Sequence, residues 1–95
     1  MSLAQTDNLP VSQKLIIGVD MAKAEFAAGT VRHEQYKYEG KRPNTVAECA
    51  AFAAQMETLK QMRGAATIHL IIEPSGGYEA QLVSEAYRRQ WRVTL

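Results

Sequence analysis

Cysteine is nearly absent from this chain of 95 residues, which contains Cys49 alone. A single cysteine excludes an internal disulfide framework, so a reducing, cytoplasmic setting is the simplest expectation. The two histidines, His33 and His69, lie far apart in the sequence. Together with Cys49 they form no spacing typical of a zinc site.

Long apolar runs and a strong charge imbalance are absent as well. No apolar run approaches the about 18 residues of a membrane-spanning helix, and residues 1–13 lack the apolar segment of a signal peptide, so we expect no membrane partner. The formal net charge of +1 does not by itself indicate a nucleic acid or a membrane surface. With 46% hydrophobic and 22% charged residues, the composition is that of an ordinary globular domain.

The start of the chain differs from the rest. Residues 1–13 are largely polar and show no hydrophobic pattern, which predicts a flexible leader. Residues 14–95 carry the patterned segments and would form one small domain or part of one, since single domains typically have about 100–150 residues.

Two segments are the most apolar of the chain, Lys14–Val19 and Ile68–Ile72. Their apolar residues follow one another almost without alternation, which predicts strands buried on both faces at the centre of a sheet. A carboxylate follows each segment directly, Asp20 after the first and Glu73 after the second. An ionised carboxylate in an apolar setting is costly unless it is hydrogen-bonded, paired or bound to a metal, so both acids need a partner.

A hairpin is expected between these two segments. Glu25–Val31 and Gln35–Glu39 have the composition of antiparallel strands joined by a turn near Arg32–Glu34. Gly40–Pro43 is predicted to end the second of these strands, because glycine and proline interrupt regular pairing.

A helix follows the hairpin. Asn44 or Thr45 can cap its start, and Gly64 is a typical residue for its end. The spacing of apolar residues predicts that its buried stripe consists of Val46, Cys49, Ala53, Met56 and Leu59.

A second helix fits Tyr78–Gln90, and Arg92–Leu95 begins a further strand. Arg88 and Arg89 stand where the helix dipole favours positive charge, and with Arg92 they could instead contact a nucleic acid backbone. The expected core side of this helix carries Tyr78, Leu82, Val83, Ala86 and Tyr87.

The expected order of elements is therefore β-β-β-α-β-α-β. Short turns favour antiparallel pairing, whereas helical crossovers favour parallel pairing. The order predicts an α/β fold with a mixed sheet.

Asp20 and Glu73 become neighbours if the two apolar strands pair in parallel. Both carboxylates would then emerge at the carboxyl edge of the sheet, where open α/β sheets bind their ligands. Two carboxylates brought together repel each other unless a cation such as Mg²⁺ bridges them. Two such ions serve phosphodiester chemistry, for which two carboxylates are too few. The alternative for each acid alone is a turn residue or a helix cap.

Two motifs resemble the N-terminal part of IS110-family insertion-sequence transposases. Ile17-Gly18-Val19-Asp20, followed by Ala22-Lys23, is similar to the family pattern I-G-[IV]-D-x-[AS]-K. Glu73-Pro74-Ser75-Gly76-Gly77-Tyr78 is similar to its pattern E-x-[ST]-G-x-Y. The resemblance covers Leu15 to Leu95, with the two motifs in the family's order.

The resemblance implies a ribonuclease H-like, RuvC-like fold with four acids that coordinate Mg²⁺ or Mn²⁺. Asp20 would be the first acid and Glu73 the second, both catalytic and both metal ligands. The remaining two should form a downstream D-x-x-D pair, which this sequence does not contain. We therefore expect an N-terminal piece of a DEDD transposase that has little or no catalytic activity alone.

The same resemblance implies the partners. They are the DNA of the insertion-sequence ends and target, a structured guide RNA, and further copies of the chain in a homo-oligomer. Lys23 could contact a DNA phosphate, although a solvated turn lysine is the alternative. Ser75 stands before two glycines and is better explained as a turn residue than as a nucleophile.

Two other functions remain open from the sequence. An actin-like kinase or ATPase fragment would also begin with an apolar strand, an acid and a hairpin, but Met21–Ala24 offers no phosphate-binding loop. A small α/β interaction module in which both acids are structural is the non-enzymatic alternative.

Overall fold

The computed structural model describes residues 13–32, 34–73 and 76–95. The elements follow the predicted order β-β-β-α-β-α-β. The expected leader lies outside the described residues except for Gln13, whose carbonyl oxygen accepts a hydrogen bond from the Ala66 amide at 2.7 Å. The element bounds are β1 Lys14–Met21, β2 Glu25–Arg32, β3 Gln35–Pro43, α2 Val46–Arg63, β4 Thr67–Ile72, α3 Ala80–Arg88 and β5 Arg92–Thr94.

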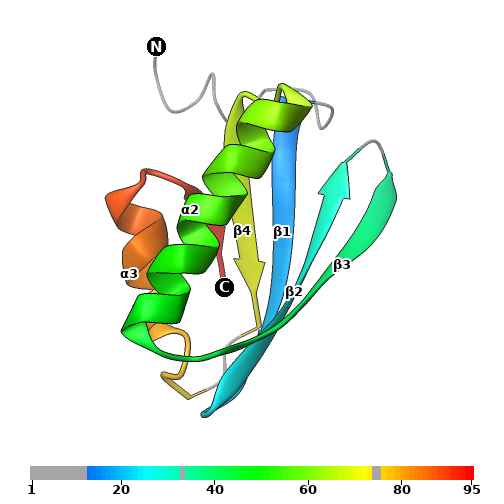
Figure 1. Cartoon of the computed structure of the whole chain (residues 1–95). Coiled ribbons are helices and arrows are strands. Elements are labelled where there is room, and N and C mark those ends of the chain that lie inside the picture. Colours follow the sequence, from blue (N-terminus) through cyan, green and yellow to red (C-terminus); the bar gives the residue numbers. More distant parts are fainter. Residues whose placement is uncertain (1–12, 33, 74–75) are drawn as a thin grey trace.

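The strands form one mixed sheet in the order β3-β2-β1-β4-β5, so that β1 lies at its centre (Figure 1). β1, β2 and β3 are antiparallel neighbours, whereas β4 pairs in parallel with both β1 and β5. The α/β class with a mixed sheet is therefore confirmed. Each parallel pair is reached through a helix, as the length of a crossover connection requires.

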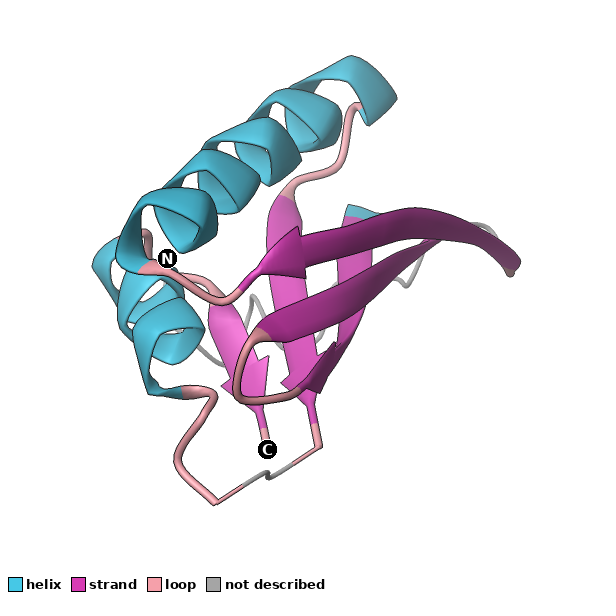
Figure 2. Cartoon of the chain, turned by 60° about the horizontal axis from the view of Figure 1, so that its bottom comes forward, coloured by secondary structure: helices cyan, strands magenta, loops and turns pink. Residues whose placement is uncertain are grey.

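Both helices lie on one side of the sheet (Figure 2). In the central strands the buried residues alternate, and those of β1 and β4 that face the helices are Leu15, Ile17, Val19, Met21, Ile68, Leu70 and Ile72. Gly18 and Ile71 stand on the opposite face and are exposed. The prediction of burial on both faces is wrong for the described part of the chain. We call this second side, which carries Gly18 and Ile71, the open face.

The ends of α2 agree with the sequence. Thr45 is the cap residue, and its Oγ1 accepts a hydrogen bond from the Glu48 amide at 3.2 Å. Gly64 closes the helix with a φ of 66°, the left-handed conformation that glycine adopts without strain.

The buried side of α2 differs from the predicted stripe at two positions. Val46, expected in the stripe, is 68% exposed. Phe52, which was not expected there, is fully buried and packs edge-to-face on Phe26 with ring centroids 5.3 Å apart. The apolar pattern of a helix allows more than one stripe, and the position of the hairpin that carries Phe26 selects between them.

The strand β3 continues through the segment that was predicted to end it. Opposite Ala28 and Gly29 the register shifts by one residue, and Gly40 takes a φ of 98°. The β-bulge accommodates Gly40 within the strand, and the pairing of β3 with β2 continues as far as Pro43. Next to the bulge, the fully buried Thr30 donates a hydrogen bond from Oγ1 to Glu39 Oε2 at 2.9 Å.

The helix α3 is shorter than predicted and buries fewer aromatic residues. Tyr78 precedes it and Tyr87 faces outward, with 45% and 62% of their surface exposed. The buried positions are Leu82, Ala86 and, unexpectedly, Glu85. The Glu85 carboxylate forms ion pairs with Arg88 and Arg89 at 3.2 and 3.3 Å. Both arginines thus have a partner within the same segment of the chain.

No helix among the described residues is long and apolar enough to cross a membrane.

Cys49 lies in the core, as its place in the apolar stripe predicted. Burial raises the pKa of its thiol, and the negative charges of Glu85 and Glu48 raise it further. A raised pKa keeps the thiol protonated and unreactive at neutral pH.

The difference between the predicted and observed stripes of α2 can be tested by truncation. Phe52→Ala should lower the free energy of unfolding by about 3–5 kcal/mol, since it empties a fully buried ring site. Val46→Ala should change it by no more than about 0.5 kcal/mol, because the side chain is exposed. Urea unfolding followed by circular dichroism measures both, and equal costs would contradict the burial described above.

Cys49 should make the stability of the chain depend on alkaline pH. Above about pH 8.5 the unfolded thiol loses its proton while the folded thiol keeps it. Ionisation therefore stabilises the unfolded state, and the free energy of unfolding falls as pH rises. Cys49→Ala should remove this part of the slope. Urea unfolding at several pH values from neutral to alkaline gives the slopes, and identical slopes in both proteins would refute the assignment.

Candidate metal-binding site

Asp20 and Glu73 lie next to each other in the sheet. Their strands pair in parallel, which is the condition for the two acids to be neighbours, and the register ends with Val19 opposite Ile72. Asp20 follows Val19 and Glu73 follows Ile72 directly, so the two acids occupy adjacent positions at the carboxyl ends of neighbouring strands. Neighbouring strands are about 4.8 Å apart, so the backbones of the two acids lie side by side at the ends of this pairing.

Both acids belong to the open face of the sheet. Val19 and Ile72 point into the core, and because side chains alternate along a strand, Asp20 and Glu73 turn the opposite way. Both are exposed, and both line a depression of about 370 Å³ on this face. Substrate or solvent can therefore reach the carboxylates.

Two glycines, Gly18 and Gly29, are among the residues that line this depression. Gly18 and Gly29 stand opposite each other in the pairing of β1 and β2. Gly29 is in turn paired with Tyr38, and Gly18 with Ile71, so larger side chains flank the glycines on both sides. The Tyr36 ring lies on Gly29 so closely that a Cβ there would come within 2.4 Å of it. Gly18 has no such cover, since a Cβ there would meet no atom within 4 Å, so the hollow is open above Gly18.

Neither carboxylate has a partner among the described residues. No salt bridge or hydrogen bond joins the side chain of Asp20 or Glu73 to them, although other acids of the chain are paired. Two unpaired like charges on neighbouring strand positions repel each other. Exposed carboxylate oxygens are the ligands that Mg²⁺ and Mn²⁺ prefer, so the pair fits one side of such a site. Within the described ranges, no third acid, histidine or cysteine joins them in a metal-binding cluster.

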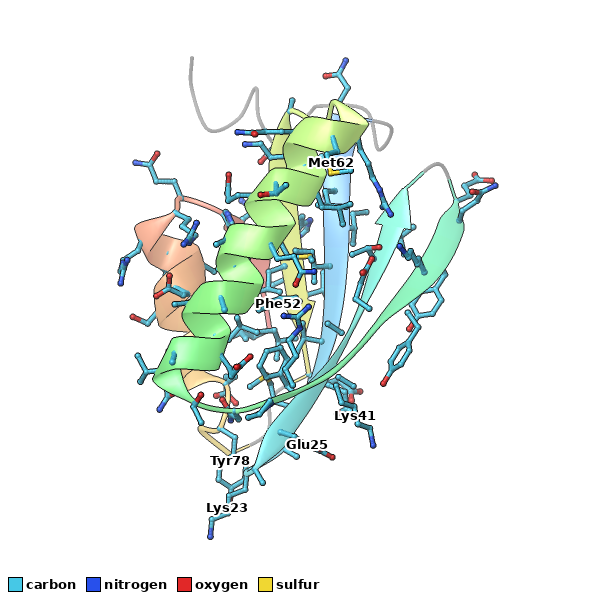
Figure 3. All side chains as sticks on the ribbon, in the orientation of Figure 1. Lys23, Glu25, Lys41, Phe52, Met62 and Tyr78 are labelled. Carbon is cyan, nitrogen blue, oxygen red and sulfur yellow. The ribbon has the colours of Figure 1, made fainter. Side chains whose placement is uncertain are left out.

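Lys23, which the sequence offered either as a phosphate contact or as a solvated turn lysine, stands in the turn between β1 and β2 and is exposed. Its side chain extends away from the end of the sheet at which β1 finishes (Figure 3). Lys23 is not among the residues that line the depression. Ser75 of the second motif lies outside the described residues, while Gly76 and Gly77 take φ values of 70° and 99° in the turn before α3.

His69 lies in the middle of β4, between two buried apolar residues. It alternates with the buried Ile68 and Leu70 and therefore stands on the open face. Its Nε2 atom lies 2.7 Å from Thr94 Oγ1 on β5, so a hydrogen bond is present. Because the residues on both sides of His69 are apolar, the sequence does not indicate which face of the sheet His69 occupies.

Comparison with known proteins provides no family for this chain, because neither a scan against family models nor a search of curated proteins finds a match. The interpretation of the site therefore depends on the strand register, the two acids and the motifs that contain them.

The proximity of the two acids predicts a coupling between their charges. Without divalent ions and at low salt, Asp20→Asn or Glu73→Gln should raise the free energy of unfolding by about 0.2–1 kcal/mol, because either change removes the repulsion between neighbouring strands. The double variant should gain about as much as either single variant. Urea unfolding in EDTA measures this, and two fully additive effects would mean that the carboxylates do not interact.

Proposed function

We propose that this chain is the N-terminal part of a ribonuclease H-like, RuvC-like catalytic domain of a DEDD transposase. Its reaction would be the Mg²⁺- or Mn²⁺-dependent cleavage and strand transfer of DNA during transposition of an insertion sequence. The observation that carries the proposal is the in-register parallel pairing of β1 and β4, which sets Asp20 beside Glu73 at one edge of the sheet.

The architecture agrees with this proposal. A ribonuclease H-like core has three meandering strands followed by strands reached through helices, and the element order and mixed sheet of this chain are compatible with it. One fold serves many reactions, so the proposal depends on the acids more than on the topology.

Asp20 and Glu73 would act together as ligands. Their oxygens would hold the divalent ion at the open depression, where a DNA phosphodiester can approach from solvent. A bound ion would supply Lewis-acid chemistry, namely activation of the attacking oxygen and compensation of the charge that develops at phosphorus. The paired apolar residues that precede the acids along β1 and β4 hold the two strands in register, and this register places the two ligands side by side.

Two further acids would complete the site. They would come from a D-x-x-D pair, which the present sequence does not contain. The 95-residue chain should therefore bind the ion weakly and should not cleave DNA. The DNA ends, a guide RNA and further copies of the chain belong to the proposal as partners of the complete enzyme, with Lys23 as a phosphate contact.

The proposal predicts that the chain binds Mn²⁺ through these two acids. Asp20→Asn and Glu73→Gln should each weaken binding about tenfold, which is the loss of ~1.4 kcal/mol expected when one of two charged ligands is removed. Electron paramagnetic resonance of free Mn²⁺ measures the affinity.

Glu34→Gln provides a matched control for this experiment. Glu34 is an exposed acid in the turn between β2 and β3, at the end of the sheet opposite to Asp20 and Glu73. Its substitution should leave the affinity unchanged. Equal affinity in all four proteins would exclude the shared site and favour a non-catalytic interaction module. A nucleotide-binding pattern in the reading frame beyond Leu95 would instead favour an actin-like kinase.

A further inference from the structure

Asn44, which the sequence offered as a helix cap, has a different position in the structure. It lies between β3 and α2, and the cap of α2 is Thr45. The Asn44 Nδ2 atom donates one hydrogen bond to the Ala22 carbonyl oxygen at 3.1 Å and another to the Tyr78 carbonyl oxygen at 3.0 Å. Both protons of a single amide group are thus used to join two separate loops.

Two more contacts fix the orientation of Asn44. Its backbone amide donates to the Ala24 carbonyl oxygen at 2.9 Å. Its Oδ1 atom accepts a hydrogen bond from the buried Cys49 thiol at 3.7 Å. The donors and the acceptor of the side chain are all engaged, so the carboxamide cannot rotate without breaking several contacts.

The two loops joined by Asn44 follow the candidate metal ligands, because Asp20 is the last but one residue of β1 and Glu73 comes directly after β4. Ala22 stands two positions after Asp20, and Tyr78 stands five positions after Glu73. Lys23 and Tyr78, one from each loop, lie at the same end of the molecule (Figure 3). The ladder between β1 and β4 stops at Val19 and Ile72, one residue before the acids. Beyond that point the separation of the loops depends on other contacts, and Asn44 supplies two of them.

We propose that Asn44 is a positioning residue of the candidate metal site, because its carboxamide ties the loop after β1 to the loop after β4 and so fixes the separation of Asp20 and Glu73. This role in ion binding rests on the proposed function of the two acids. The tie between the loops is a structural claim that can be tested without any ion. Residues that hold metal ligands in place typically change affinity by about 10–100-fold when removed.

The test uses the 95-residue chain with Asn44→Ala and Asn44→Asp. Aspartate has the shape of asparagine, but it lacks both donors and places a negative charge against two carbonyl oxygens. Thr45→Ala is the matched control, because it removes the neighbouring cap bond to Glu48 and leaves both loop contacts in place. Amide hydrogen exchange by nuclear magnetic resonance and Mn²⁺ affinity by electron paramagnetic resonance are measured on all of them, at a temperature where every variant is folded.

Both Asn44 variants should accelerate exchange at the amides of residues 22–24 and 76–79 and weaken Mn²⁺ binding about tenfold, the lower end of the effect cited above. Thr45→Ala should change exchange only near the start of α2 and keep the affinity. In an Asp20→Asn background, Asn44→Ala should cause no further loss of affinity, since it acts through the position of the acids.

Two results would overturn the inference. If the Asn44 variants exchange like Thr45→Ala in both loops, the tie does not exist. If the loops are loosened but Mn²⁺ binding stays at the wild-type level, Asn44 does not position the site. A wild-type chain that binds no Mn²⁺ would instead refute the proposed function, and the exchange measurement alone would then decide whether the tie exists.

Discussion

The parallel register between β1 and β4 is the constraint on which the rest of the structure depends. It joins the antiparallel hairpin to the helical half of the chain, and it pairs Leu15 with Ile68 and Val19 with Ile72. All four side chains face the helices and are buried. A slip of one residue would turn one strand's apolar side chains to the open face and would separate Glu73 from Asp20. The core and the candidate site are thus fixed by the same pairing.

The elements of this fold could be predicted because each has a local cause. Apolar runs marked the central strands, and Gly64 marked the end of α2 with the conformation that it adopts. The face that each strand buries could not be predicted in the same way. Ile71 and Gly18 continue the apolar pattern while standing on the exposed side. A strand covered on one face and a strand covered on both have the same pattern when the uncovered positions are apolar or small.

The candidate site was predictable to the extent that its residues bear chemistry. Asp20 and Glu73 could be located because each carboxylate follows an apolar strand. Asn44 could be read only as a helix cap, since its partners at Ala22 and Tyr78 are carbonyl oxygens of the backbone. Every residue carries such an oxygen, so no residue type identifies it. Contacts of this kind appear only when the path of the chain is known.

The bulge in β3 affects how copies of this chain can associate. β3 forms one border of the sheet, and an additional strand would have to pair with its free side. The shifted register at Gly40 bends that border, Pro43 has no amide proton to offer, and Lys37 and Lys41 are charged and exposed. Each of these features opposes strand-by-strand growth into a fibre. Any assembly of several copies would therefore be built more readily through the open face or the border at β5 than by extending the hairpin.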